Sequence, residues 1–155
     1  MVDLERKILG WREWLALPDL AIGQIKAKVD TGAKTSALHA YYVQPYERDG
    51  APWVRFGIHP LQLSTSNSID CEARVKDMRL VTDSGGHAEM RPVIETTLLV
   101  GGQRRLIELT LTDRETMRFR MLLGRSALKR HYVVDSSKSF MLGGNRTLPP
   151  LIISS

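Results

Sequence analysis

The feature that most limits the fold of this 155-residue chain is a series of short segments in which apolar and polar residues alternate. Residues 22–29, I-G-Q-I-K-A-K-V, are apolar at four alternating or near-alternating positions, and residues 104–112 follow a similar pattern. Successive side chains of a strand point to opposite faces, so these segments predict strands with one buried face. The chain is therefore predicted to be all-β.

Turns that contain glycine divide the rest of the chain into further strands. E-R-D-G at 47–50, D-S-G-G at 83–86 and G-G at 101–102 are typical of hairpins, because glycine adopts positive φ without steric cost. One short helix is predicted at 125–132, where apolar residues recur at helical spacing. The other predicted strands are 37–43, 53–58, 69–81, 90–100 and 121–123, with a closing pair at 133–134 and 140–142.

Length and composition fit one domain over residues 1–155, with a core at about 10–145 and a surface tail at 146–155. With Cys71 as its one cysteine, the chain cannot form an intramolecular disulfide, and we interpret Cys71 as a buried apolar residue rather than a nucleophile. The first residues lack the apolar core of a secretory signal, and no run reaches the ~18 apolar residues of a membrane span. We expect a soluble, cytoplasmic protein.

The net charge of +5 is concentrated in one stretch. Residues 101–130 contain eight Arg or Lys against three acids, while the other residues balance at fourteen of each sign. Such a surplus attracts anionic partners, although a solvated basic face with no partner has the same composition. Phe119 is the one aromatic residue of this stretch, and single-strand binders need stacking platforms, so nucleic acid is not the favoured partner.

The segment K-V-D-T-G-A-K-T-S-A-L-H-A, residues 28–40, places Asp30, Thr31 and Gly32 directly after an apolar strand. Asp-Thr-Gly is often plain turn chemistry, in which Asp binds its own backbone, and that interpretation stays open. A second apolar segment, L-L-G-R, follows at 122–125.

The pairing of V-D-T-G-A with L-L-G-R resembles the retroviral-type aspartic proteases. Together with R-P-V-I at 91–94, the segment 111–125 and G-W-R-E-W-L-A-L-P-D-L at 10–20, it is similar to the bacterial retropepsin-like (RimB-like) family often labelled "ATP-dependent zinc protease". The resemblance covers roughly residues 10–132. It implies a closed retropepsin-like β-barrel and a homodimeric aspartic endopeptidase in which two copies of Asp30 meet across a two-fold axis.

The resemblance also implies roles for individual residues. Asp30 would be catalytic, with Thr31 and Gly32 shaping its loop, and residues 82–91 would form a flap, although an ordinary surface hairpin looks the same. The apolar support of the loop would be Leu122, Leu123 and Gly124, and the candidate substrate contacts are Lys34, His39, Arg91 and Arg125.

The family's label raises the question of zinc and ATP. The chain has no H-E-x-x-H, no Cys-x-x-Cys and no G-x-x-x-x-G-K-S/T, so we expect neither a metal nor a cofactor. A zinc site that uses Asp30 and His39 is conceivable, since both flank one loop, but it would need further ligands. A zinc-dependent hydrolase is therefore the third of three alternatives.

Lys34 departs from the viral pattern, in which an acid follows Asp-Thr-Gly-Ala. A lysine in the cleft favours an acidic peptide, unless Lys34 is only a solvated turn residue. The family is associated with the ATP-grasp glutamate ligase RimK, so the expected substrate is an acidic or poly-glutamate tail of the kind that such a ligase adds. The competing class is a non-catalytic basic β-barrel that binds RNA or an acidic protein.

Overall fold

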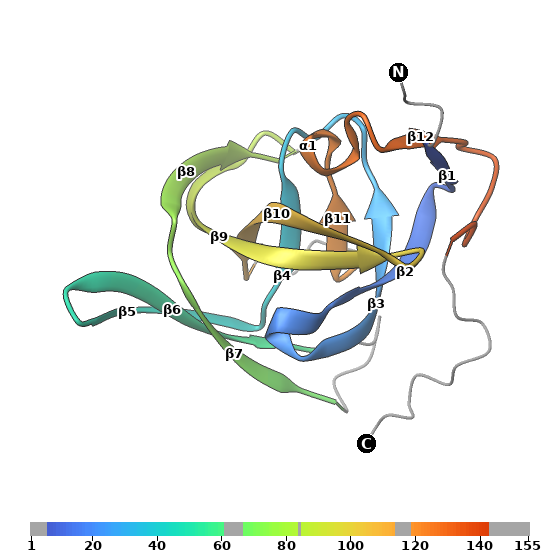
Figure 1. Cartoon of the computed structure of the whole chain (residues 1–155). Helices are drawn as coiled ribbons and strands as arrows, with labels where there is room; N and C mark the ends of the chain where they lie inside the picture. Colours follow the sequence, from blue (N-terminus) through green and yellow to red (C-terminus); the bar gives the residue numbers. More distant parts are fainter. Residues whose placement is uncertain (1–5, 61–66, 84, 114–118, 143–155) are drawn as a thin grey trace.

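The computed structural model describes residues 6–60, 67–83, 85–113 and 119–142, and within them the chain is built almost entirely of strands (Figure 1). A 3-10 turn, η2 (Pro18–Leu20), and one short helix, α1 (Arg125–Leu128), complete the described secondary structure. The strands are β1 (Lys7–Leu9), β2 (Arg12–Leu17), β3 (Ile22–Val29), β4 (Ser36–His39), β5 (Tyr42–Arg48), β6 (Ala51–Ile58), β7 (Ile69–Arg74), β8 (Asp77–Thr82), β9 (Ala88–Val100), β10 (Gln103–Thr112), β11 (Met121–Leu123) and β12 (Tyr132–Val134).

The largest sheet closes into a ring of strands. Its order is β10-β4-β11-β3-β2-β9-β8, and β9 also pairs with β10, which closes a ring of six strands and leaves β8 outside it, paired with β9. The contact between β2 and β9 is a single residue pair, Ala16 with Leu99, so the ring is not a regular barrel. The predicted all-β class with one short helix is confirmed, and no helix of the described residues is long and apolar enough to cross a membrane.

The interior of the ring is filled by the inward faces of its strands. Along β3 the fully or nearly fully buried residues are Ile22, Ile25, Ala27 and Val29, which are the apolar positions of the alternating pattern. Each Å² of apolar surface that is buried stabilises the folded state by about 25 cal/mol. The four apolar side chains therefore determine which side of β3 faces the core. A one-residue slip would turn the apolar side chains of β3 toward water.

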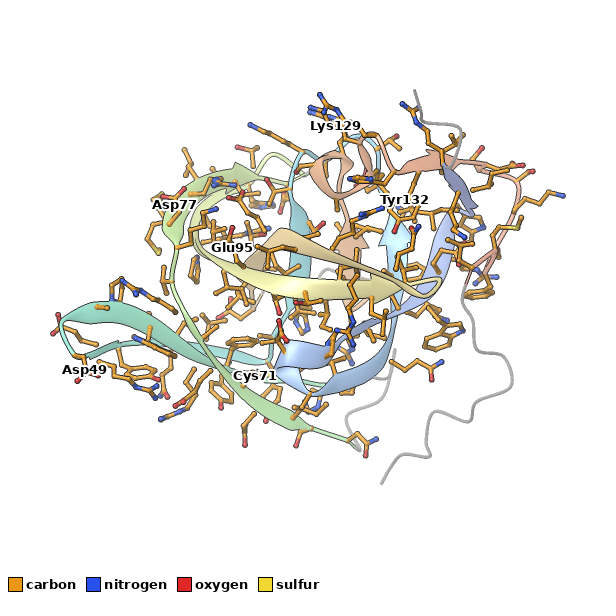
Figure 2. The ribbon with its side chains drawn as sticks, in the orientation of Figure 1. Asp49, Cys71, Asp77, Glu95, Lys129 and Tyr132 are labelled. Atoms are coloured by element: carbon orange, nitrogen blue, oxygen red, sulfur yellow. The ribbon has the colours of Figure 1, made fainter. Side chains whose placement is uncertain are left out.

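A second sheet, β5-β6-β7, extends from the ring as an arm (Figure 1). Asp49 and Gly50 join β5 to β6 as a two-residue turn with φ of 53° and 78°, the geometry for which Asp-Gly is favoured. Figure 2 shows Asp49 at the tip of the arm and Cys71 near its base, where Phe56 and Ile58 enter the core. Cys71 is buried, as predicted, and its Sγ lies 3.5 Å from the carbonyl oxygen of Leu20.

Several sequence-predicted elements have the predicted bounds. The strands at 22–29 and 121–123 match residue for residue, and the turn at 101–102 has positive φ at both glycines. The turn predicted at 47–50 is confined to Asp49 and Gly50, because β5 continues to Arg48. Most of the polar connection at 61–68, and the tail at 146–155, lie outside the described residues.

Other predictions were wrong in extent. The predicted strand 37–43 is interrupted at Ala40 and Tyr41, where the chain leaves the ring and enters the arm. The predicted strand 69–81 is divided at Val75 and Lys76, where the chain changes partner from β6 to β9.

The C-terminal predictions also need correction. The helix ends at Leu128 rather than at residue 132, and Arg130 has a positive φ of 71°. The predicted pairing of 133–134 with 140–142 is wrong, because β12 pairs in parallel with β1. The N–H of Phe140 instead binds the carbonyl of Arg12, and the N–H groups of Met141 and Leu142 bind the buried Glu13 carboxylate.

Candidate active site

The loop between β3 and β4 carries Asp30, Thr31 and Gly32 at the end of a buried strand. The N–H of Asp30 donates to the carbonyl of Leu123 at 2.8 Å, and its Oδ1 accepts the N–H of Gly32 at 2.9 Å. The N–H of Ala33 then closes a turn on the Asp30 carbonyl at 3.2 Å. The side chain of Asp30 is half-buried, and Thr31 and Gly32 are exposed beside it.

The strand β11 lies directly behind this loop. It pairs in parallel with the end of β3 and antiparallel with β4, so it occupies the space between the two strands that the loop connects. Leu123 is fully buried and Leu122 half-buried. Backbone hydrogen bonds hold this apolar strand on both sides, directly behind the loop for which the resemblance implies an apolar support.

Gly124 allows the two segments to approach closely. A Cβ at this position would lie 2.7 Å from the carbonyl carbon of Thr35 and 3.0 Å from the carbonyl oxygen of Ala33. Its N–H donates to the buried Oγ of Ser36 at 3.0 Å. Ser36 was missed by the sequence analysis, and a hydroxyl at the first position of a buried strand is the signal that indicates such a partner.

The start of α1 is fastened to the other side of the loop. The N–H of Arg125 donates to the Ala33 carbonyl at 2.8 Å, and both the N–H and the Oγ of Ser126 donate to the Lys34 carbonyl. The guanidinium of Arg125 donates to the Thr31 carbonyl at 3.2 Å rather than to an acid. The side chains of Lys34 and Arg125 are exposed, and neither forms an ion pair with any residue that the structure describes.

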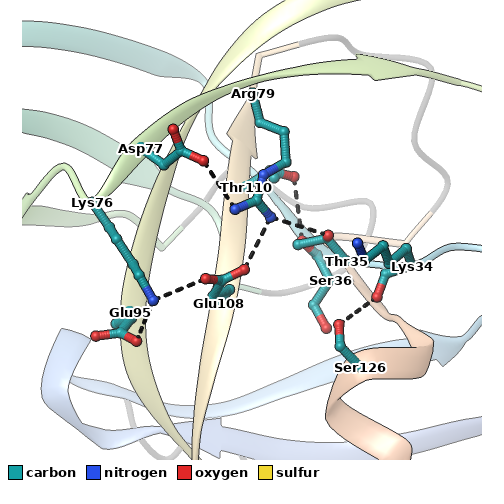
Figure 3. Close-up of polar contacts among 10 residues, drawn as sticks. All are labelled: Lys34, Thr35, Ser36, Lys76, Asp77, Arg79, Glu95, Glu108, Thr110 and Ser126. Carbon is teal, nitrogen blue, oxygen red and sulfur yellow. Dashed lines mark hydrogen bonds and ion pairs between the residues drawn. The ribbon is translucent and has the colours of Figure 1, made fainter.

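The hairpin of β8 and β9 is the element that the sequence proposed as a flap. At its tip the N–H of Asp83 binds the carbonyl of His87, and Gly86 has a φ of 86°. One face of its stem contacts the candidate site, because the guanidinium of Arg79 lies 3.4 Å from the Oγ1 of Thr35 (Figure 3).

Ion pairs hold this stem against β10. Arg79 binds Glu108 at 2.9 Å and Asp77 at 3.0 Å, and Lys76 joins Glu108 to Glu95 (Figure 3). The hydrogen bonds from Lys76 and Arg79 lower the pKa of the Glu108 carboxyl from its ordinary value. The network therefore connects the hairpin to β10 through ion pairs, and to the loop residue Thr35 through a hydrogen bond from Arg79.

Two of the predicted substrate contacts are buried. Arg91 donates from Nε to Glu89 at 2.7 Å, and Glu89 also accepts the hydroxyl of Thr112. His39 lies beside Thr112 across the β4–β10 pairing, about four residues or ~13 Å from Thr35 along the strand. The loop therefore brings together Asp30, Lys34 and Arg125, but not His39.

The described residues contain no group of three or more His, Cys, Asp or Glu that could hold a metal ion. The described residues around Asp30 therefore do not fit the zinc of the family's label.

Comparison with known proteins gives a family match and several long relatives. Residues 8–143 match the model of the RimB-like family, described as "Retropepsin-like aspartic endopeptidase RimB". A "Probable alpha-L-glutamate ligase" of Shewanella pealeana is 46% identical over 136 residues, which are 88% of this chain and 30% of that protein. A relative of the same name from Desulfotalea psychrophila is 43% identical over 91% of this chain and 30% of its own length. The chain thus spans about a third of these relatives, and their names carry no mention of zinc.

A solved structure has the same fold. It is the crystal structure of the protein Lpg0085 from Legionella pneumophila, described as of unknown function, with a TM-score of 0.72 and 28% identity. The match covers 88% of this chain and 98% of that one. With the family model matched over most of its length, the chain belongs to the RimB-like family of retropepsin-like aspartic endopeptidases.

Proposed function

We propose that this chain is an aspartic endopeptidase that acts as a homodimer and cleaves acidic, glutamate-rich peptide. The observation that supports this most is the position of Asp30, half-buried on a loop that β11, Gly124 and α1 fasten from behind and from one side. If Asp-Thr-Gly were only a turn, it would need the hydrogen bond between Asp30 and Gly32 but not the contacts with β11, Gly124 and α1. The family description agrees with this chemistry.

A single chain supplies one carboxylate, so the site requires a second copy. Two Asp30 side chains that meet across a two-fold axis cannot both ionise, and they share one proton. The ionised member takes a proton from water as the water oxygen attacks the peptide carbonyl carbon, and the protonated member donates to the carbonyl oxygen. The tetrahedral intermediate then loses the amine, which accepts a proton, and a carboxyl group and an amine are released.

The acidic substrate is inferred from charge. Lys34 and Arg125 are exposed cations at the loop, where they would attract carboxylates on either side of the bond that is cut. We assign substrate contact to these two residues and not to Arg91 or His39, which are buried.

A link to a glutamate ligase is inferred from the relatives. Proteins named as probable glutamate ligases carry a segment like this chain within a polypeptide about three times as long. We infer that this chain acts on glutamate chains that a separate ligase makes, and that ligase activity itself requires the rest of those longer proteins.

The test is cleavage of an α-linked oligoglutamate peptide, read by mass spectrometry. Wild type should cut the peptide, Asp30→Asn should not, and a chelator should leave the rate unchanged. Loss of activity with the chelator would favour a zinc-dependent hydrolase. Absence of cleavage by wild type, together with tight peptide or RNA binding, would favour a non-catalytic binding module.

A further inference from the structure

The outer face of β2 and β3 carries three cations and no acid. Arg12 lies opposite Lys28, and Trp14 lies opposite Lys26, so these side chains share one face of the strand pair. Glu13 lies between Arg12 and Trp14 in the sequence, but its side chain points inward. It is fully buried and accepts the backbone N–H of Gly10.

Aromatic rings hold two of these cations in place. The Arg12 guanidinium lies 4.7 Å from the ring centroid of Trp11 and 4.9 Å from that of Phe140. The Lys26 ammonium lies 5.7 Å from Trp14 and 5.8 Å from Phe119. The rings also contact one another, with centroids 5.9 Å apart for Trp11 and Phe119. We call this set the basic aromatic patch: Trp11, Arg12, Trp14, Lys26, Lys28, Phe119 and Phe140.

The cations of the patch lack the carboxylate partners that several other described cations have. Lys76, Arg79, Arg48 and Arg55 all form ion pairs at 2.8–3.0 Å. Within the described ranges, no carboxylate lies within ion-pair distance of the three cations of the patch. Burial, and then repulsion by the Arg12 charge, lower the pKa of Lys26 from its ordinary value.

We propose that the basic aromatic patch is a second binding site for carboxylate side chains of an acidic peptide, separate from the Asp30 loop. The inference rests on the proposed function, and it extends the peptide beyond the loop. Along the chain, Lys28 is two residues before Asp30, or about 7 Å away, and Lys26 is four residues before it, or about 13 Å away. A peptide centred on Asp30 would therefore reach Lys28 with about four residues and Lys26 only with about eight.

The contacts favour carboxylates over nucleic-acid bases. Bases bind by stacking on free aromatic faces, but here Arg12 and Lys26 already lie over the rings. A cation that a ring already holds in place loses less side-chain conformational entropy when an anion binds to it. A purely structural role, in which the rings only fasten residues 139–142 to β2, would not account for Lys28, which is exposed on the same face as Arg12.

The test measures binding of labelled α-linked oligoglutamates by fluorescence anisotropy in an Asp30→Asn background, so that no peptide is cut. The patch variant is Arg12→Gln, Lys26→Gln and Lys28→Gln. The matched control removes the same charge from exposed residues elsewhere, Arg74→Gln, Arg104→Gln and Lys129→Gln. Two peptides are used, one of about four residues, which spans ~13 Å, and one of about ten residues.

The patch variant should bind the long peptide about tenfold more weakly at low salt, and the control should bind it within about twofold of the background. Affinity for the short peptide should fall less than affinity for the long peptide in the patch variant, because a four-residue peptide centred on Asp30 reaches no farther than Lys28. The losses should shrink as salt is added. Should the triple variant fail to fold by circular dichroism, Lys28→Gln alone is measured, with about a twofold to threefold loss expected.

Equal loss in patch and control variants, or no loss in Lys28→Gln, would overturn the proposal. So would absence of long-peptide binding, or tighter binding of single-stranded oligouridine than of the long peptide at the same salt. Cleavage is scored separately with the wild-type chain: binding through the patch without any cleavage would reject the peptidase and keep the patch. The two proposals therefore fail by different results.

Discussion

Gly124 is the residue at which one added carbon would disturb the candidate site most directly. Its φ is −92°, so any residue could adopt the backbone conformation, and the constraint is space alone. The carbonyls of Thr35 and Ala33 fill the position where a Cβ would lie. The glycine of L-L-G-R is thus required by the close approach of β11 to the Asp30 loop.

Gly124→Ala should lower the free energy of unfolding by about 1–3 kcal/mol, because the backbone of the loop must move to admit the methyl group. Urea unfolding checks this value. Gly23→Ala is the control, since nothing lies within 4 Å of a Cβ there and the expected change is within about 0.5 kcal/mol. Similar values for the two variants would show that the packing at Gly124 is not tight.

Cys71 should be almost unreactive in the native protein. Burial, helped by the neighbouring Asp70 charge, raises the pKa of its thiol from 9.0 to about 12. At pH 8 this rise lowers the thiolate fraction about a thousandfold, and the thiolate is the nucleophile. Iodoacetamide should therefore alkylate the native chain at least a hundredfold more slowly than the urea-unfolded chain.

The control is a Gln44→Cys, Cys71→Ala variant, which has an exposed thiol on β5 and should react rapidly in both the native and the unfolded state. If Cys71 of the native wild-type chain reacted as fast as this thiol, the burial of Cys71 would be contradicted.

At the level of elements, the sequence predicts strands well where one face is buried and the partner is local. The strand 22–29 and the turn at 49–50 are examples, since alternation and Asp-Gly both depend on neighbouring residues. Divided strands are harder to predict. The backbone at Val75 and Lys76 binds Pro52 and then Val93, and that change of sheet leaves no mark in a run that alternates on both sides of it.

The same distinction applies to the candidate site. The loop and its support are indicated by the resemblance that Asp-Thr-Gly and L-L-G-R carry together. Each motif is a short run of residues, so it can be recognised without knowledge of the strand pairing. Burial of Arg91 was missed, although Glu89 two positions earlier points to the same face of the strand and could have indicated the ion pair. The position of His39 depends on the direction in which β4 leaves the loop, and that direction is set by pairing with β10.

The ion pairs of the hairpin predict a pH-dependent stability. Because the folded-state pKa of Glu108 is lowered, its contribution is present above its ordinary pKa of 4.5 and is lost as the pH falls through the lowered value. Glu108→Gln should therefore lower the free energy of unfolding by about 1 kcal/mol at pH 7, and the difference should close as the pH is lowered below 4.5.

Urea unfolding at pH 7 and at a pH below 4.5 measures this difference. Glu47→Gln, on the exposed part of β5, is the control and should change stability little at either pH. A Glu108→Gln effect of the same size at both pH values would mean that charge pairing with Lys76 and Arg79 is not its cause.

At the scale of the whole molecule, we propose one active site that takes Asp30 from each of two chains. The fold places one such aspartate at an exposed loop, and the family consists of retropepsin-like aspartic endopeptidases. The site would belong to the dimer, because one chain supplies one carboxylate and the chemistry uses two.

The most direct measurement mixes wild-type and Asp30→Asn chains in varying ratio at constant total concentration, after exchange of subunits, and follows oligoglutamate cleavage. If both chains must supply Asp30, a mixed dimer is inactive and the rate should follow the square of the wild-type fraction. A rate that falls in direct proportion to the wild-type fraction would show that one chain is sufficient, and it would contradict the dimeric aspartic site.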